Sequence, residues 1–316
     1  MAATTSVKPA TAIGDSHLVD MNAFLPGRML NDETCLAACR LLEEGKILYF
    51  AQSPFPLPPE DIDVLLRQRQ SDRRWHKNIA YRPLQDRLTG FDPKHSDAAR
   101  MHEIMRSFSR RLLDYAGKLL PAYARVWRLD YASFRPLEEQ GRQLRLQARN
   151  DLVHVDSFPK RPTHGDRILR MFTNINPHAE RHWITSDPLD ELARQMGKQF
   201  AEQFVPATGP ALWRRWAVRA GLSLRPYSAY DEAMRGIHRR MKESTVFQQY
   251  CRKHHSHFPP GSAWLVFTDA VPHAVVSGQY ALEQTVIVPR SAMLLPERSP
   301  AAVLERLATP ERKQAA

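Results

Sequence analysis

Two histidines and one aspartate are the residues of this chain whose types and spacing are best suited to chemistry. His154 and Asp156 lie two positions apart, and His273 follows much later. On an extended segment, side chains at positions i and i+2 point to the same side, so His154 and Asp156 can face one ion. Two imidazoles and one carboxylate form the facial triad that holds non-haem Fe(II) and leaves other coordination positions open. The pattern predicts an iron centre at His154, Asp156 and His273.

Segments with strand character flank both parts of this motif. Residues 142–153 end in apolar residues, 157–166 contain the prolines and glycine of a loop, and 167–176 have strand character again. Near the later histidine, a Pro-Pro-Gly turn leads into the apolar residues 263–267, and 284–288 are a further expected strand. This order predicts an α+β fold whose core is a double-stranded β-helix, a jelly-roll of the cupin type, with helices before it.

The other histidines have less support as metal ligands. His254, His255 and His257 form a polar run before the Pro-Pro turn, where we expect a solvated or anion-facing segment. A second group lies in or near predicted loops without a carboxylate at ligand spacing: His164, His178 and His182.

The composition is typical of a soluble globular protein of the cytoplasm. Hydrophobic residues make up 43% of the 316 residues, yet no apolar run approaches the ~20 residues that span a bilayer. Residues 1–17 lack the pattern of a secretory signal, and Cys35, Cys39 and Cys251 are poorly placed for disulfides. The net charge of +11 favours a polyanionic partner, which could be nucleic acid, an anionic membrane or an acidic substrate.

We expect three parts along the chain. Residues 1–30 form an irregular lead, 31–295 a single domain, and 296–316 a C-terminal tail or short helix. A helical insertion over about 188–257 separates the two halves of the metal motif. Its portion Trp213–Lys253 carries ten Lys or Arg against three Asp or Glu, a net charge of +7. Aromatic residues beside its arginines suit either an anionic interface or a solvated basic face with buried tryptophans.

The N-terminal half contains recognisable helices. Apolar residues recur at intervals of three and four over 97–120, which predicts an amphipathic helix with one face on the sheet. The other expected elements are helices over 31–45 and 60–70 and strands over 46–51 and 126–134.

Several of these segments resemble the bacterial Kdo 3-hydroxylases, where Kdo is 3-deoxy-D-manno-oct-2-ulosonic acid. The likeness covers most of residues 20–290, and the stretch 153–177 (VHVDSFPKRPTHGDRILRMFTNINP) is its most specific part. The other segments that carry it are 45–51 with the following SPFPLPP, Arg181-His182-Trp183, and 260–275 (PGSAWLVFTDAVPHAV).

The resemblance implies an Fe(II)- and 2-oxoglutarate-dependent dioxygenase, with ascorbate as an optional reductant. It implies hydroxylation of Kdo at C3 to give Ko, on a Kdo-bearing lipid A precursor of the lipopolysaccharide inner core. His154, Asp156 and His273 match the metal positions of the family. The location implied is the cytoplasm, peripheral at the inner face of the bacterial inner membrane, and no nucleic acid partner is expected.

The distal carboxylate of 2-oxoglutarate also needs a partner, most often an arginine. Many members of the wider superfamily place it on the strand after the distal histidine, but residues 281–285 contain no basic residue. We therefore expect Arg170, on the strand after the first metal pair, to bind this carboxylate, with Asn174 and Gln284 beside it. Arg167 is the second candidate. In the alternative interpretation, Arg170 forms a structural ion pair with an acidic neighbour.

Two other functions compete with this one. A related oxygenase acting on nucleic acid or protein would suit the basic insertion, and predicts strongly salt-dependent binding. A non-catalytic jelly-roll that binds anions would lack the metal, and the intact triad argues against it.

Overall fold

The chain folds into a mixed α+β structure with two β-sheets. The computed structural model describes residues 17–25, 30–68, 78–92, 94–205 and 228–308. Within them, the larger sheet has the strand order β1-β2-β9-β6-β11-β5-β3-β4, and the smaller has the order β10-β7-β8. The strands are β1 Leu18–Asp20, β2 Ile47–Phe50, β3 Ile79–Arg82, β4 Arg87–Thr89, β5 Arg128–Arg135, β6 Arg167–Asn174, β7 Arg181–Thr185, β8 His254–Phe258, β9 Ala263–Phe267, β10 His273–Ser277 and β11 Ala281–Val288.

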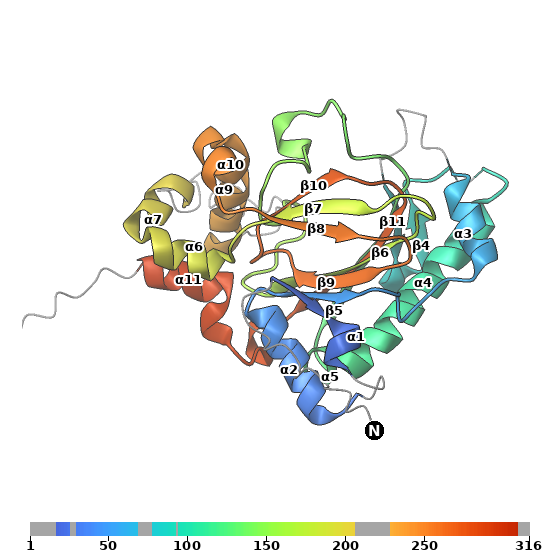
Figure 1. Ribbon diagram of the computed structural model, residues 1–316, viewed down its shortest axis with the longest axis horizontal. Coiled ribbons are helices and arrows are strands. Elements are labelled where there is room, and N and C mark those ends of the chain that lie inside the picture. The colour runs from blue at the N-terminus through green and yellow to red at the C-terminus, as the bar shows by residue number, and fades with distance from the viewer. Residues whose placement is uncertain (1–16, 26–29, 69–77, 93, 206–227, 309–316) are drawn as a thin grey trace, which may run out of the picture.

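Helices flank the sheets in two groups. Figure 1 shows α2, α4 and α5 on the outer side of the larger sheet, and α6, α7, α9, α10 and α11 gathered at one end. The α-helices are α1 Met21–Phe24, α2 Asp32–Glu43, α3 Pro59–Leu66, α4 Ala98–Leu119, α5 Pro121–Ala124, α6 Leu189–Met196, α7 Lys198–Phe204, α9 Ala229–Glu243, α10 Thr245–Tyr250 and α11 Pro300–Ala308. In the described part, no helix is both long and apolar enough to cross a membrane.

Local sequence explains the N-terminal helices. Asn31 caps α2, since its side chain accepts from the Thr34 amide while the Thr34 hydroxyl oxygen accepts from the Asn31 amide. On α4, the buried residues Met101, Ile104 and Phe108 form the expected apolar stripe and pack against the larger sheet. The helices predicted from periodicity are confirmed, with ends shifted by a few residues.

The space between the two sheets is filled by aromatic rings at one end. Side chains alternate between the two faces of β6, so Leu169 and Met171 lie on the α4 side and Phe172 lies in the space between the sheets. There, Phe172 and Trp264 of the larger sheet meet Phe258 of the smaller one. The rings of Phe258 and Trp264 stack with centroids 3.8 Å apart. These contacts hold the two sheets face to face and leave the other end for polar groups.

Three expectations about secondary structure are wrong. The approach to the metal pair is not a strand, because residues 142–153 contain only a short 3-10 helix, Leu146–Ala148. Part of the supposed irregular lead forms β1, which pairs in parallel with β2. Residues 254–258 form the strand β8, so the helical part of the insertion ends at Tyr250 rather than at 257, although His255 and His257 on this strand are exposed as expected. Residues 206–227 of that insertion lie outside the described residues.

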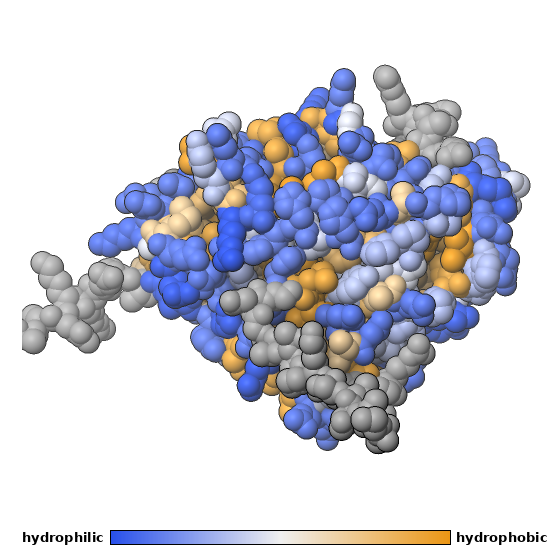
Figure 2. Space-filling model, viewed as in Figure 1, coloured by the Kyte–Doolittle hydropathy of each residue, from blue (hydrophilic) through white to orange (hydrophobic). Residues whose placement is uncertain are grey.

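The C-terminal segment contains a packed helix. Val303 of α11 is buried with Leu189 and Leu192 of α6 in a second hydrophobic cluster, which also contains residues of α9. On the face in Figure 2, hydrophilic residues dominate and hydrophobic ones form separate small groups.

Candidate active site

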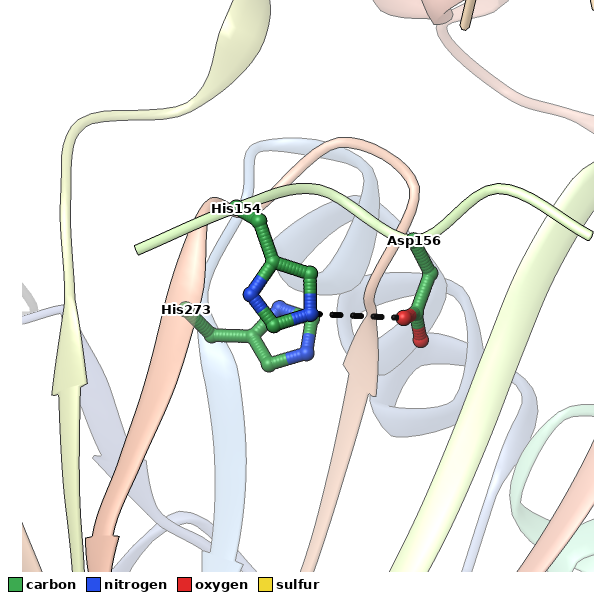
Figure 3. A group of neighbouring side chains, drawn as sticks. All are labelled: His154, Asp156 and His273. Carbon is green, nitrogen blue, oxygen red and sulfur yellow. Dashed lines mark ion pairs between the residues drawn. The ribbon is translucent and has the colours of Figure 1, made fainter. Parts of the chain in front are cut away.

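The three predicted metal residues come together in space. One donor atom each from His154, Asp156 and His273, here called the metal triad, lies within 4.8 Å of the others. Among the described residues, this is the one group of three or more His, Cys, Asp or Glu side chains that could hold a metal. The His154 and His273 ring centroids are 5.0 Å apart, and His154 Nε2 is 3.9 Å from Asp156 Oδ1. Figure 3 shows the three side chains, with a dashed line joining His154 to Asp156. Such a donor set fits Fe(II).

Backbone pairing positions His154 and Asp156 although the segment that carries them is not a strand. His154 and His273 form an isolated antiparallel bridge, each donating its amide to the carbonyl of the other at 3.0 and 2.9 Å. The Asp156 amide donates to the Thr268 carbonyl at 2.8 Å. His154 and Asp156 therefore sit on extended chain, and their i, i+2 spacing turns both side chains to the same side, as predicted.

Hydrogen bonds fix which imidazole nitrogen is available. Nδ1 of His154 donates to the Leu152 carbonyl at 2.6 Å, and Nδ1 of His273 donates to the Val271 carbonyl at 2.9 Å. Each ring then presents Nε2, without a proton, to the centre. Outer hydrogen bonds of this kind orient metal-binding histidines.

The electrostatic environment keeps the triad in its metal-binding form. Burial lowers the pKa of His154 and of His273, so both rings stay neutral. Burial raises the pKa of Asp156, but the guanidinium of Arg170 beside it outweighs burial and holds that pKa well below its usual range. One side of the centre is closed by Trp183, whose ring stacks on His273 with centroids 5.2 Å apart.

Arg170 lies at this centre, but in an ion pair. Its Nη1 donates to Asp156 Oδ2 at 2.7 Å, and its Nη2 lies 2.5 Å from Glu283 Oε1. The second oxygen of Glu283 lies 2.8 Å from Arg135 Nη2, and Arg135 is 3.7 Å from Glu139. This buried row of alternating charges corresponds to the structural ion pair that was the alternative interpretation of Arg170.

The residues expected beside Arg170 lie elsewhere. Gln284 is on the opposite face of β11, where its side chain accepts from Ser109 of α4 and donates to the Asp130 carbonyl, so its predicted position is wrong. Asn174 donates its amide to the Ala179 and Phe258 carbonyls at 2.9 Å. Arg167 is buried in an ion pair with Asp269 at 2.8 Å.

Histidines outside the triad have other partners. His182, His255 and His257 share the outer face of the smaller sheet, where His182 Nε2 is 2.9 Å from His255 Nδ1 and the rings of His182 and His257 stack. His254 lies 3.5 Å from Asp187. His164, on its loop, lies 3.3 Å from Asp231. None of them joins the metal triad.

Two residues near the triad were missed from the sequence. Glu283 is a carboxylate within the apolar strand β11, and a charge in such a place indicates a buried cation partner. His238 of α9 donates Nδ1 to the Val155 carbonyl at 2.7 Å, with its ring 4.9 Å from that of His154. Nothing in the local pattern of α9 indicates this contact.

Comparisons with known proteins agree with this site. The model of the family described as 3-deoxy-D-manno-oct-2-ulosonic acid (Kdo) hydroxylase matches residues 27–311. The crystal structure of the Kdo hydroxylase KdoO with alphaketoglutarate and Fe(III) aligns with a TM-score of 0.78 at 31% identity, covering 92% of this chain and 95% of that chain. The complex of KdoO with succinate and Fe(III) aligns with the same score and coverage at 30% identity. A search of curated proteins gave no match.

The fold and the triad define an enzyme of the non-haem iron dioxygenase class. Within that class, the chain belongs to the Kdo hydroxylase family. The family resemblance predicted from the sequence is confirmed, and so is the mixed α+β fold.

Proposed function

We propose that this protein uses Fe(II) and 2-oxoglutarate to hydroxylate Kdo at C3, giving Ko on a Kdo-bearing lipid A precursor. The observation that carries the proposal is the metal triad, in which two imidazoles and one carboxylate face one point and both Nδ1 atoms are held by carbonyls. Family membership supplies the sugar. The two facing sheets fit a jelly-roll core, with the basic helical insertion between its metal-binding segments.

Each residue of the centre has a distinct part in this chemistry. When bound, iron would activate dioxygen at the expense of 2-oxoglutarate, which loses CO2 to give succinate, so that one oxygen atom enters succinate and the other converts a C–H bond of the sugar into C–OH. Nε2 of His154, Nε2 of His273 and a carboxylate oxygen of Asp156 would hold the metal. Arg170 engages Oδ2 of Asp156, which leaves Oδ1 for the metal and fixes the carboxylate plane. Trp183 packs on His273 and excludes water from that side.

Arg170 therefore acts first on the metal ligand. Its Nη1 and Nη2 engage Asp156 and Glu283 at 2.7 and 2.5 Å, and these two carboxylates already offset its charge. Orientation of Asp156 is the role that these contacts favour. Variants of Arg170 separate these two roles. Loss of the orienting role lowers the stability of the metal-free protein, whereas loss of a co-substrate contact lowers the affinity for 2-oxoglutarate.

Membrane contact is part of the proposal, because the substrate is a lipid. Val246 and Tyr250 are 63% and 73% exposed and lie four positions apart on α10, so they share one face. The exposed Arg252 and Lys253 follow directly. Apolar side chains beside cations suit an anionic bilayer surface. Arg214, Arg215 and Arg219, part of the charge excess found in the sequence, lie outside the described residues.

This surface adjoins the metal centre through one side chain. Gln248 of α10 donates to the Val153 carbonyl at 2.8 Å and accepts from the Val153 amide at 2.9 Å. The helix α10, which would contact the membrane, is thus hydrogen-bonded to Val153, the residue before His154. We place the protein in the cytoplasm, peripheral at the inner membrane.

The deciding experiment incubates the purified protein with Fe(II), 2-oxoglutarate and a Kdo-bearing lipid A precursor. Mass spectrometry should show the addition of one oxygen atom to a Kdo residue, with stoichiometric succinate. The same reaction with His273→Ala is the control and should give no product. Succinate formation without oxidised sugar, or oxidation of an added oligonucleotide instead, would contradict the proposal.

A further inference from the structure

A cluster of cations and aromatic rings lies on the larger sheet beyond Arg170. The guanidinium carbons of Arg82 and Arg161 lie 4.7 and 4.3 Å from the ring centroid of Tyr131, so one ring contacts two cations. Arg161 also lies over Phe158, at 4.2 Å. We call Arg82, Tyr131 and Arg161 the arginine–tyrosine cluster. Its members come from β3, β5 and the loop after Asp156.

Strand register places this cluster on the same face of the sheet as Arg170. Arg170 of β6 pairs with Thr285 of β11, which lies opposite the bulge of β5 that contains Tyr131. Tyr81 pairs with Ala132, so Arg82 is beside Tyr131. Neighbouring strands are about 4.8 Å apart, and three steps put Arg82 roughly 14 Å from Arg170 along the backbone.

The loop that carries Arg161 connects the cluster directly to the metal triad. It begins at Asp156, and within five residues Arg161 reaches across to an ion pair with Asp130 of β5. Phe158 lies between them in sequence and packs under the guanidinium of Arg161. The cluster is therefore joined to the metal ligand Asp156 by a short loop segment and lies on the same face of the larger sheet as Arg170.

The charges of the cluster do not balance. Asp130 offsets Arg161, but no acidic side chain in the described part of the chain is in ion-pairing distance of Arg82, so two guanidiniums face one carboxylate. The Nε–H of Arg82 is buried and has no hydrogen-bond acceptor among the described residues. Arg170 and Arg181 share this feature at Nε, so what distinguishes Arg82 is that its half-buried charge has no carboxylate partner among the described residues.

We propose that the arginine–tyrosine cluster binds an oxyanion of the substrate, a carboxylate or a phosphate, and so places the sugar at the iron. The inference rests on the proposed function. Arg82 supplies two parallel N–H donors to the oxyanion, the geometry that guanidinium groups adopt with carboxylates and phosphates. Tyr131 holds the planes of Arg82 and Arg161 in place, and Asp130 keeps Arg161 from swinging into the site.

The test compares Arg82→Gln with Arg87→Gln in the holoenzyme. Arg87 is exposed and pairs directly opposite Arg82 in the β3–β4 hairpin, which makes it a matched control. The apparent KM for the Kdo-bearing lipid should rise about 10- to 100-fold in Arg82→Gln, the range for losing a charge-assisted pair, and stay unchanged in Arg87→Gln. Arg82→Lys keeps the charge but loses the paired N–H donors, so its apparent KM should lie between those of Arg87→Gln and Arg82→Gln.

Modified substrates identify the oxyanion. If the Arg82→Gln penalty disappears with the methyl ester of Kdo, the ligand is the sugar carboxylate, and if it disappears with a dephosphorylated lipid, the ligand is a phosphate. Equal KM values for Arg82→Gln and Arg87→Gln on every substrate would overturn the inference while leaving the proposed function intact.

Should the wild type oxidise none of these lipids, the proposed function fails. Calorimetric titration of the same lipid into wild type and Arg82→Gln then decides the inference separately. Weaker binding by Arg82→Gln alone would support the oxyanion site, and equal binding would overturn it.

Discussion

Replacing Arg170 by methionine tests whether this residue serves the metal ligand or the co-substrate. The side chain is 11% exposed and lies between Asp156 and Glu283, which are 13% and 4% exposed. Glu283 keeps its contact with Arg135 at 2.8 Å after the change, but Asp156 retains only neutral imidazoles nearby. The unpaired carboxylate is therefore mainly Asp156. Breaking a buried pair in this way costs about 3–5 kcal/mol.

The metal makes this cost measurable in a specific way. A divalent cation at the triad would neutralise Asp156 in place of Arg170, so adding it should recover part of the lost stability. We expect urea denaturation to show a large deficit for Arg170→Met in the metal-free protein and a smaller one with saturating Co(II). Arg170→Lys, which keeps one charge but cannot bridge both carboxylates, should lose less than Arg170→Met.

Arg128→Met is the matched control for the same experiment. Arg128 pairs with Asp166 at 2.8 Å and is 57% exposed, so losing this pair should cost at most about 1 kcal/mol. The 2-oxoglutarate affinity of each metal-loaded variant completes the set. Unchanged metal-free stability in Arg170→Met, together with a large loss of 2-oxoglutarate affinity, would refute the orienting role and restore Arg170 as the co-substrate clamp.

Other parts of the molecule lead to three further predictions. Replacing any member of the metal triad by alanine should abolish iron-dependent turnover, and near-normal activity under limiting iron would exclude that residue as a ligand. Burial and the neighbouring His254 lower the pKa of His17 to about 4, so between about pH 6.5 and 4 only the unfolded state takes up this proton. The free energy of unfolding should fall as the pH drops through that range, and less so in His17→Gln; equal slopes in urea titrations would contradict this. The double variant Val246→Ser, Tyr250→Ser should weaken binding to anionic vesicles in sedimentation assays. Leu84→Ser is the control, because Leu84 is 73% exposed like Tyr250, and it should bind as the wild type does. Equal losses of vesicle binding in both variants would argue against contact through α10.

The metal triad could be predicted because its local part depends only on backbone geometry. On any extended chain, His154 and Asp156 share a side, whether or not a partner strand is present. The helix α4 was equally accessible, since an apolar repeat of three and four matches the 3.6-residue turn of an α-helix and not the alternation of a strand. Both inferences use short-range periodicity and need no knowledge of tertiary contacts.

The segment before the triad shows where such inference ends. Val153 and Val155 are apolar, as in a strand, but they are buried against helices such as α9 rather than in a sheet. The backbone amide and carbonyl of Val153 are both satisfied by the Gln248 side chain, which takes the place of a strand neighbour. A side chain from a distant helix cannot be assigned that role from sequence.

The error at Gln284 has a different cause, which is register. Arg170 pairs with Thr285, so the two side chains lie on the same face of the sheet. Side chains alternate along β11, so Glu283 also lies on this face and contacts Arg170, whereas Gln284 lies on the other face and contacts α4. A shift of one residue exchanges every side chain between the two faces of a strand. The chemical consequence is large, because a neutral amide beside Arg170 would have left its charge for 2-oxoglutarate, whereas a buried carboxylate and the metal ligand together already neutralise it. The basic residue that binds an oxyanion of the substrate is better sought where a guanidinium has no carboxylate partner among the described residues, as at Arg82.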